Sequence, residues 1–211
     1  MSLPTPYYHD EQAGITIYLG DCREILPHLE PVDLVLTDPP YGIARVWKGG
    51  ASSGWGKSSE ATEERNAWDA EAPTAETLAA VIAKATASII WGGNYFDLPK
   101  SRGWLVWTKP ERNFTLSEAE LAWTSRDTVI RIWDGIRSDP GREHPTQKPL
   151  DLMKWCLQSF PSASTILDPF MGSGTTLRAA KDLGRKCIGI EIEEKYCEIA
   201  VNRLRQEVLP L

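Results

Sequence analysis

Short apolar runs alternate with helical patterns along most of the chain, and this alternation constrains the fold more than any other feature. Strands are expected where β-branched and aromatic residues gather, at 15–19, 32–37, 88–91, 104–107, 119–123, 165–167 and 187–190. Helices are expected where apolar residues follow a helical spacing, at 23–29, 78–85, 149–160, 173–183 and 197–204. Strands separated by helices form βαβ units, which predicts a mostly parallel sheet covered on both faces.

The middle of the chain departs from this alternation, because the strand patterns between Trp104 and Trp133 have no helix between them. We expect an antiparallel edge hairpin there. A chain of 211 residues, 42% of them hydrophobic, is long enough for one sizeable core and short for two domains. The sequence therefore predicts a single α/β domain over residues 1–211. Within it, the stretch at about 42–72, rich in glycine, serine and charge, is expected to form a mobile loop.

Composition narrows the classes of protein to consider. The formal net charge of −6 argues against a surface coated in basic residues, although it permits a local basic cleft. No stretch approaches the roughly 18 to 20 consecutive apolar residues of a membrane helix. The first residues lack the charged start and the apolar run of a signal peptide. We therefore expect a cytoplasmic protein with no membrane partner.

Cysteine and histidine spacing gives no sign of a disulfide framework or a metal site. The chain contains no Cys-x-x-Cys pair. Its histidines, His9, His28 and His144, share no metal-ligand spacing. We expect a reduced protein without a metal.

A glycine-containing loop joins a strand to a helix from Asp168 to Thr176 and reads Asp-Pro-Phe-Met-Gly-Ser-Gly-Thr-Thr. Gly172 and Gly174 let the backbone turn sharply and approach a ligand, while the helix N-terminus offers free N–H donors. No Gly-Lys-Ser/Thr closes the loop, so it is not a P-loop, and the Asp168 carboxylate would repel a pyrophosphate. A carboxylate suits a ligand that carries an ammonium group, such as the methionine part of S-adenosylmethionine.

Glu191 follows the next strand along the chain. An acid at this place commonly accepts hydrogen bonds from ribose hydroxyls. The loop, its strand context and this acid together favour a nucleoside cofactor. The alternative is a structural βα turn with an unrelated surface glutamate.

The turn Asp38-Pro39-Pro40-Tyr41 follows another strand, at the end where open α/β sheets bind their ligands. Pro40 forces Pro39 into an extended conformation, which presents the Pro39 carbonyl beside the Asp38 carboxylate. These two acceptors can bind the two hydrogens of one amino group. The two hydrogen bonds favour a tetrahedral nitrogen whose lone pair can face a methyl donor. Tyr41 adds an aromatic face for an extruded base. The alternative is a proline-rich turn that caps a strand.

Together with the run His144-Pro145-Thr146-Gln147-Lys148-Pro149, these two segments resemble the β group of DNA amino-methyltransferases, which act on adenine N6 or cytosine N4. The order of the motifs, catalytic turn first and cofactor loop last, is typical of the group. The resemblance implies a circularly permuted, Rossmann-like methyltransferase fold. It also implies S-adenosylmethionine as cofactor, double-stranded DNA as partner and a place in DNA modification of the restriction-modification kind.

The resemblance assigns roles to matched residues. Those implied at the target base are Asp38, Pro39, Pro40 and Tyr41. Those implied at the cofactor are Asp21, Cys22, Asp38, Thr146, Lys148, Asp168, Phe170, Gly172, Ser173, Gly174, Thr175 and Glu191. For Lys148 the alternative is a solvated lysine that precedes a helix.

The expected loop carries candidate DNA contacts, because basic and aromatic residues are interleaved there: Arg45, Trp47, Lys48, Trp55 and Lys57. Acids in the same stretch offset these charges, so a flexible loop without a binding role is the alternative. The region at about 108–143 is shorter than the recognition insert usual in the family. It implies either a short target site or a second subunit, as in a homodimer.

Three functions stay open from the sequence alone. The first is a methyltransferase acting on adenine N6, which the Asp at the start of the turn favours by resemblance, or on cytosine N4. The second is methylation of a side-chain amide in protein, but those enzymes place the glycine loop before the turn. The third is a non-catalytic DNA-binding protein with a degenerate methyltransferase fold, against which the intact motifs argue.

Overall fold

The computed structural model describes residues 4–43, 71–110, 117–135 and 147–206. Its strands are β1 (Tyr8–Asp10), β2 (Ile15–Leu19), β3 (Val32–Thr37), β4 (Ala85–Trp91), β5 (Trp104–Thr108), β6 (Ala119–Thr124), β7 (Arg131–Asp134), β8 (Thr165–Asp168) and β9 (Lys186–Glu191). Its α-helices are α1 (Cys22–Ile25), α3 (Ala75–Ala83), α4 (Leu150–Gln158), α5 (Thr175–Asp182) and α6 (Glu194–Arg205). The described residues also form two short 3-10 helices, η1 (Leu26–His28) and η3 (Gly93–Tyr95).

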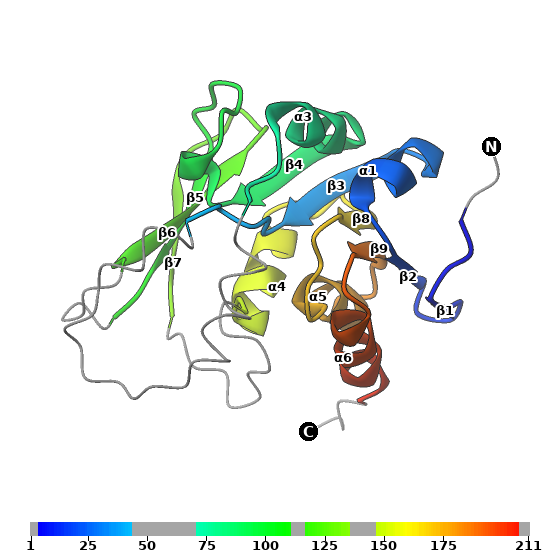
Figure 1. Ribbon diagram of the computed structural model, residues 1–211. Helices are drawn as coiled ribbons and strands as arrows, with labels where there is room; N and C mark the ends of the chain where they lie inside the picture. The colour runs from blue at the N-terminus through cyan, green and yellow to red at the C-terminus, as the bar shows by residue number, and fades with distance from the viewer. Residues whose placement is uncertain (1–3, 44–70, 111–116, 136–146, 207–211) are drawn as a thin grey trace, which may run out of the picture.

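The strands form one sheet in the order β1-β2-β9-β8-β3-β4-β6-β5-β7 (Figure 1). The five strands from β2 to β4 in this order are mutually parallel. β6 runs antiparallel to both β4 and β5, so the middle of the chain forms the antiparallel hairpin that the sequence predicts. The mostly parallel α/β sheet is therefore confirmed.

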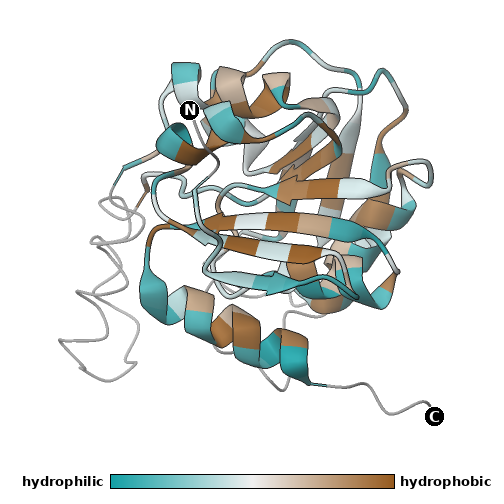
Figure 2. Cartoon of the chain, turned by 90° about the vertical axis from the view of Figure 1, so that its right-hand side faces the viewer, coloured by the Kyte–Doolittle hydropathy of each residue, from teal (hydrophilic) through white to brown (hydrophobic). Residues whose placement is uncertain are grey.

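Helices cover both faces of the sheet, α1 and α3 on one side and α4, α5 and α6 on the other (Figure 1). Alternate residues of β3 serve the two layers, because Leu34 and Leu36 pack with α4, α5 and α6 whereas Val35 packs with α1 and α3. Figure 2 shows hydrophobic residues along the strands and a mixture of hydrophobic and hydrophilic residues on the covering helices. The sheet thus has two cores, as expected for strands buried on both faces.

Several boundaries differ from the sequence prediction. The expected helix at 23–29 divides into α1 and η1, with Pro27 near the start of η1. The expected helix at 173–183 begins only at Thr175, because Gly174 at its N-cap is left-handed. The edge strands β1 and β7 were not among the expected strands, since both pair through the backbone and bury little apolar surface. In the part of the chain that the structure describes, no helix is long and apolar enough to cross a membrane.

Asp33 joins the starts of the two central strands β3 and β8. Its Oδ2 accepts hydrogen bonds from the backbone N–H and the hydroxyl of Ser164, each at 2.8 Å, and from those of Thr165 at 2.8 and 2.9 Å. These donors lower the pKa of the Asp33 carboxyl below its ordinary value. The contacts therefore stabilise the fold above the ordinary aspartate pKa and are lost as the pH falls through the lowered one.

We expect Asp33→Ala to lower the free energy of unfolding at pH 7 by about 1–3 kcal/mol, because four donors lose a charged acceptor. The loss should shrink at acid pH, where the wild-type carboxyl becomes protonated. Urea unfolding at several pH values measures both effects. Glu30→Ala, which removes an exposed carboxylate nearby in the chain, is the control and should change stability little. An Asp33 variant as stable as this control would contradict the proposed link.

Candidate active site

Four carboxylates lie at the carboxyl ends of four adjacent parallel strands. Asp21 follows β2, Glu191 ends β9, Asp168 ends β8 and Asp38 follows β3, in the spatial order of these strands across the sheet. β3 pairs directly with β8, so Asp38 and Asp168 belong to neighbouring strands. The carboxyl edge of such a sheet is where α/β proteins bind ligands.

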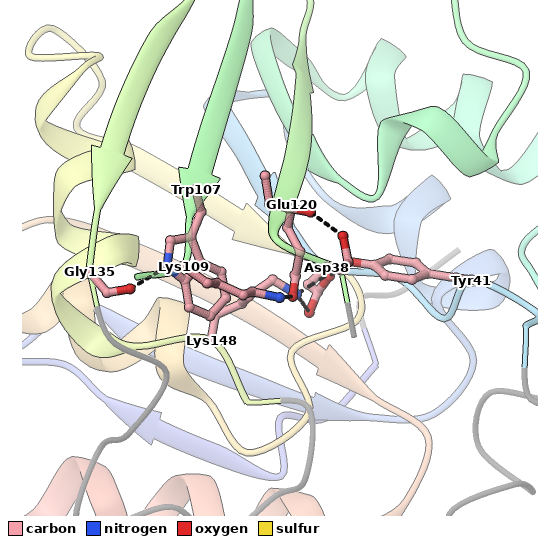
Figure 3. A network of polar contacts seen from close by, with 9 residues as sticks. Asp38, Tyr41, Trp107, Lys109, Glu120, Gly135 and Lys148 are labelled. Atoms are coloured by element: carbon pink, nitrogen blue, oxygen red, sulfur yellow. Dashed lines mark hydrogen bonds and ion pairs between the residues drawn. The ribbon is translucent and has the colours of Figure 1, made fainter. Parts of the chain in front are cut away.

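The Asp38 carboxylate is held by two donors (Figure 3). The Tyr41 hydroxyl donates to Oδ1 at 2.6 Å, and the Lys148 ammonium donates to Oδ2 at 2.6 Å. Lys148 also donates to the Tyr41 oxygen at 3.2 Å, and only 6% of its side chain is exposed. The structure therefore brings the turn together with the Lys148 segment, and Lys148 is not a solvated lysine.

Glu120 and Lys109 extend this network, and the sequence analysis missed both. Glu120 Oε2 lies 3.1 Å from Lys148 Nζ, and Lys109 Nζ donates to Glu120 Oε1 (Figure 3). Lys109 is 3% exposed, so it too is a buried cation. An acid inside the otherwise apolar strand β6 was the available sequence signal, because a buried carboxylate needs a paired cation.

The network fixes the charge of its members. Burial alone would lower the pKa of Lys148, but Asp38 and Glu120 raise it well above its ordinary value. Burial alone would raise the pKa of Glu120, but Lys148 and Lys109 lower it to about 2. Burial raises the pKa of Asp38, and Lys148 partly offsets this effect. The ammonium of Lys148 thus stands charged between two acids.

Aromatic residues form a wall beside the turn. The Tyr41 ring stacks on Tyr95 with centroids 4.9 Å apart and an interplanar angle of 18°, and Phe96 meets it edge-on at 6.1 Å. Gly92, at φ +69°, makes room for the ring, because a Cβ there would lie 2.1 Å from the Tyr41 Cε1. One face of Tyr41 is therefore covered, whereas Tyr95 is 48% exposed.

Asp168 is buried at the start of the glycine loop. Its Oδ1 accepts hydrogen bonds from the Thr37 hydroxyl at 2.7 Å and from the Phe170 N–H at 3.2 Å. Burial raises its pKa to about 6, although hydrogen bonds from Thr176, Thr37 and Phe170 oppose the rise. Asp168 is therefore an acid whose charge changes near neutral pH and which a neighbouring cation would stabilise as the anion.

Glu191 supports the same loop through Oε2, which accepts the N–H of Gly172 at 2.9 Å, while its Oε1 accepts the N–H of Glu193 before α6 at 2.9 Å. Gly172 has φ +50°, and a Cβ there would meet no atom within 4 Å. The loop backbone therefore faces open space beside an acid, which fits a nucleoside bound close to the main chain.

Arg203 of α6 ties the loop to the Lys148 segment. One of its nitrogens, Nη1, donates to the hydroxyls of Ser173 at 3.2 Å and Thr175 at 3.0 Å, and Nη2 donates to Gln147 Oε1 at 2.9 Å. Ser173 and Thr175 are thus engaged in loop structure. The sequence analysis missed Arg203 because it lies in the last helix, far along the chain from Gln147.

Asp21 is the carboxylate farthest from Asp38 in the strand order. It caps α1 by accepting the Arg23 N–H at 2.8 Å, and it pairs with the Arg23 guanidinium. Cys22 begins this helix and is buried, and burial raises the pKa of its thiol to about 11. Within the described ranges, no group of three or more His, Cys, Asp or Glu residues could hold a metal ion.

Some expected site residues lie outside the described residues. They are Thr146 and the candidate DNA contacts Arg45, Trp47, Lys48, Trp55 and Lys57. Parts of the expected loop at 42–72 and of the expected recognition region at 108–143 are likewise not described.

Comparisons with known proteins find similar sequences among DNA methyltransferases. A family model described as DNA methylase matches residues 103–202. The type II methyltransferase M2.LlaDCHI of Lactococcus lactis subsp. cremoris is 27% identical over 259 residues, covering 95% of this chain and 92% of the relative. M.ScaI of Streptomyces caespitosus, another type II methyltransferase, is 27% identical over 282 residues, covering 100% of this chain and 87% of the relative.

Solved structures share the fold. The M1.HpyAVI complex with SAM has a TM-score of 0.58 at 23% identity and covers 91% of this chain and 100% of its own. The cytosine-N4-specific PvuII DNA methyltransferase has a TM-score of 0.65 at 16% identity, and the match covers 97% of this chain and 90% of the PvuII enzyme. The family model and the relatives support a DNA amino-methyltransferase of the N6/N4 type, and the solved structures show the shared fold alone.

Proposed function

We propose that this protein transfers a methyl group from S-adenosylmethionine to the exocyclic N6 of an adenine flipped out of double-stranded DNA. The observation that carries the proposal is the Asp38 carboxylate, which follows the strand next to that of Asp168 and its glycine loop. A group that can bind an amino nitrogen thus neighbours a loop suited to a nucleoside.

The described residues fit the cofactor. Asp168 would hold its ammonium group, and the Glu191 carboxylate would accept its ribose hydroxyls. The open space at Gly172 would admit it beside the backbone. When bound, S-adenosylmethionine supplies a methyl group on a sulfonium centre. A structural neighbour solved in complex with SAM supports this choice.

Asp38 and the Pro39 carbonyl would orient the target. By accepting the two hydrogens of the amino group, they favour a tetrahedral nitrogen whose lone pair is available to attack. No covalent enzyme intermediate is needed, and catalysis rests on positioning and electrostatics. Adenine is proposed over cytosine on the resemblance of the Asp-initiated turn. The comparisons do not decide the base, and one structural neighbour, the PvuII DNA methyltransferase, is cytosine-N4-specific.

The open aromatic face for the flipped base is proposed to come from Tyr95 as well as Tyr41. Tyr41 has one face on Tyr95, whereas Tyr95, at the end of η3, keeps about half of its surface exposed. A base that enters beside the turn can stack on this surface. We also propose that the stretch at about 42–72 closes over the DNA through its basic and aromatic residues, and that the region at 108–143 reads a short target.

The decisive experiment identifies the methylated base. Unmethylated DNA is incubated with the protein and S-adenosylmethionine, and its nucleosides are analysed by mass spectrometry. N6-methyladenine is expected. N4-methylcytosine alone would reverse the choice of base but keep the mechanism, whereas methyl incorporation only into protein would overturn the function.

Asp38→Ala should abolish turnover and leave S-adenosylmethionine affinity within a few-fold, because its main partner is the target amino group. Transfer of labelled methyl to DNA measures the first effect and calorimetric titration the second. Glu11→Ala, which removes an exposed carboxylate from the β1–β2 turn, should behave as wild type. Near-wild-type methylation by Asp38→Ala would show that the turn is not catalytic.

The affinity for S-adenosylmethionine should fall as the pH drops below about 6, because Asp168, with its pKa of about 6, loses its charge there. A cation that binds only the ionised acid loses up to about tenfold in affinity per pH unit. Asp168→Asn should bind more weakly at pH 7.5 and lack this dependence. Calorimetry between pH 5 and pH 8 tests both, and an equal pH dependence in the variant would exclude Asp168 as its source.

Tyr95→Ala should raise the KM for DNA about tenfold, since stacking on one aromatic residue contributes about 1–3 kcal/mol per base. Tyr95→Phe keeps the ring and should stay near wild type, which separates stacking from the hydroxyl. Steady-state kinetics with unmethylated DNA gives both values. If the alanine and phenylalanine variants have the same KM, Tyr95 does not contact the base.

A further inference from the structure

Four groups of alternating charge, two buried lysines and two partly buried acids, run through the site in the order Lys109, Glu120, Lys148, Asp38 (Figure 3). Each lysine lies within ion-pair distance of the acid or acids next to it, so two positive and two negative charges balance. The sequence separates these residues widely, and the fold brings them together at β5, β6 and the carboxyl end of β3. In such an arrangement, the ammonium of Lys148 can move from one acid to the other and stay paired throughout.

Both Asp38 oxygens are already occupied in this structure, Oδ1 by the Tyr41 hydroxyl and Oδ2 by Lys148. An amino group that binds Asp38 has to compete with these donors, and the ammonium of Lys148 is the stronger competitor because its hydrogen bond to the carboxylate is charge-assisted. Tyr41 is restrained by its stacking on Tyr95, by Phe96 and by the close backbone of Gly92. Lys148 has a flexible four-carbon stem, so it is the donor that can move.

A destination for the Lys148 ammonium is already in place. Glu120 Oε2 lies 3.1 Å from Nζ, against 2.6 Å for Asp38 Oδ2, so a small shift exchanges the nearer partner. Lys109 holds the other oxygen of Glu120 and fixes its carboxylate. Without Glu120, an ammonium leaving Asp38 would be buried and unpaired, which is strongly unfavourable.

We propose that Glu120 is a positioning residue for methyl transfer, which takes the Lys148 ammonium when the target amino group replaces it on Asp38. Lys148 thereby serves as a stand-in for the substrate amino group before the base arrives. The inference rests on the proposed function. It adds to that function a step in which substrate entry exchanges one donor on Asp38 for another.

The test measures kcat, the KM for DNA and S-adenosylmethionine affinity of the full chain with unmethylated DNA. Glu120→Gln should lower kcat by 10- to 100-fold, because Lys148 then stays on Asp38, and should leave cofactor affinity within twofold. Glu120→Asp keeps the charge but withdraws the carboxylate from Lys148, and should give an intermediate kcat. A purely structural role would instead lower the melting temperature and cofactor affinity together with kcat.

A double variant distinguishes the proposed exchange of Lys148 between Asp38 and Glu120 from the mere loss of the contact between Glu120 and Lys148. Glu120→Gln with Lys148→Met removes the competing ammonium and restores charge balance, so its kcat should equal or exceed that of Glu120→Gln alone. A double variant that loses the product of the two single losses would overturn the inference, as would wild-type kcat in both Glu120 variants. If the wild type transfers no methyl to DNA, the proposed function fails and this inference falls with it.

Discussion

The parallel direction of β2, β9, β8 and β3 is the constraint on which the site depends. Each strand ends in an acid or is followed by one, and a common direction brings all four acids to one edge. Strands of this length span about 17–20 Å, so reversing one of them would carry its acid to the opposite edge of the sheet. The helices that connect parallel strands have to cross over the faces, which is why both faces are buried and why the site lies at an edge.

Buried charge is the second organising feature. Lys109 and Lys148 would be costly to bury unpaired, and the partly exposed carboxylates of Glu120 and Asp38 offset part of that cost. Arg203 acts in the same way at the other motif, where one guanidinium satisfies Ser173, Thr175 and Gln147 together. Polar contacts of this kind join segments that are far apart in the sequence, so they hold the turn, the loop and the Lys148 segment in one arrangement.

The strands of the parallel core could be predicted from the sequence because they are continuous apolar runs between turn residues. The pairing of β3 with β8, which makes Asp38 and Asp168 neighbours, does not follow from these runs, because they give no strand order. The partners of Lys148 could not be predicted, because the contact with Glu120 depends on how β6 aligns with β4 and β5. Edge strand β7 was missed for the opposite reason: its exposed side chains give no burial pattern, and backbone pairing with β5 alone defines it.

Because the two lysines are buried, salt affects their ion pairs differently from charges at the surface of this protein. Dissolved ions screen exposed charges over about 10 Å at 0.1 M ionic strength, but they do not reach Lys109 and Lys148, which are 3% and 6% exposed. Contacts with the phosphates of a nucleic acid, by contrast, are made at the surface and release counterions. Ionic strength should therefore affect the capture of the proposed DNA substrate, while the ion pairs that the two buried lysines make near Asp38 should respond to salt much less.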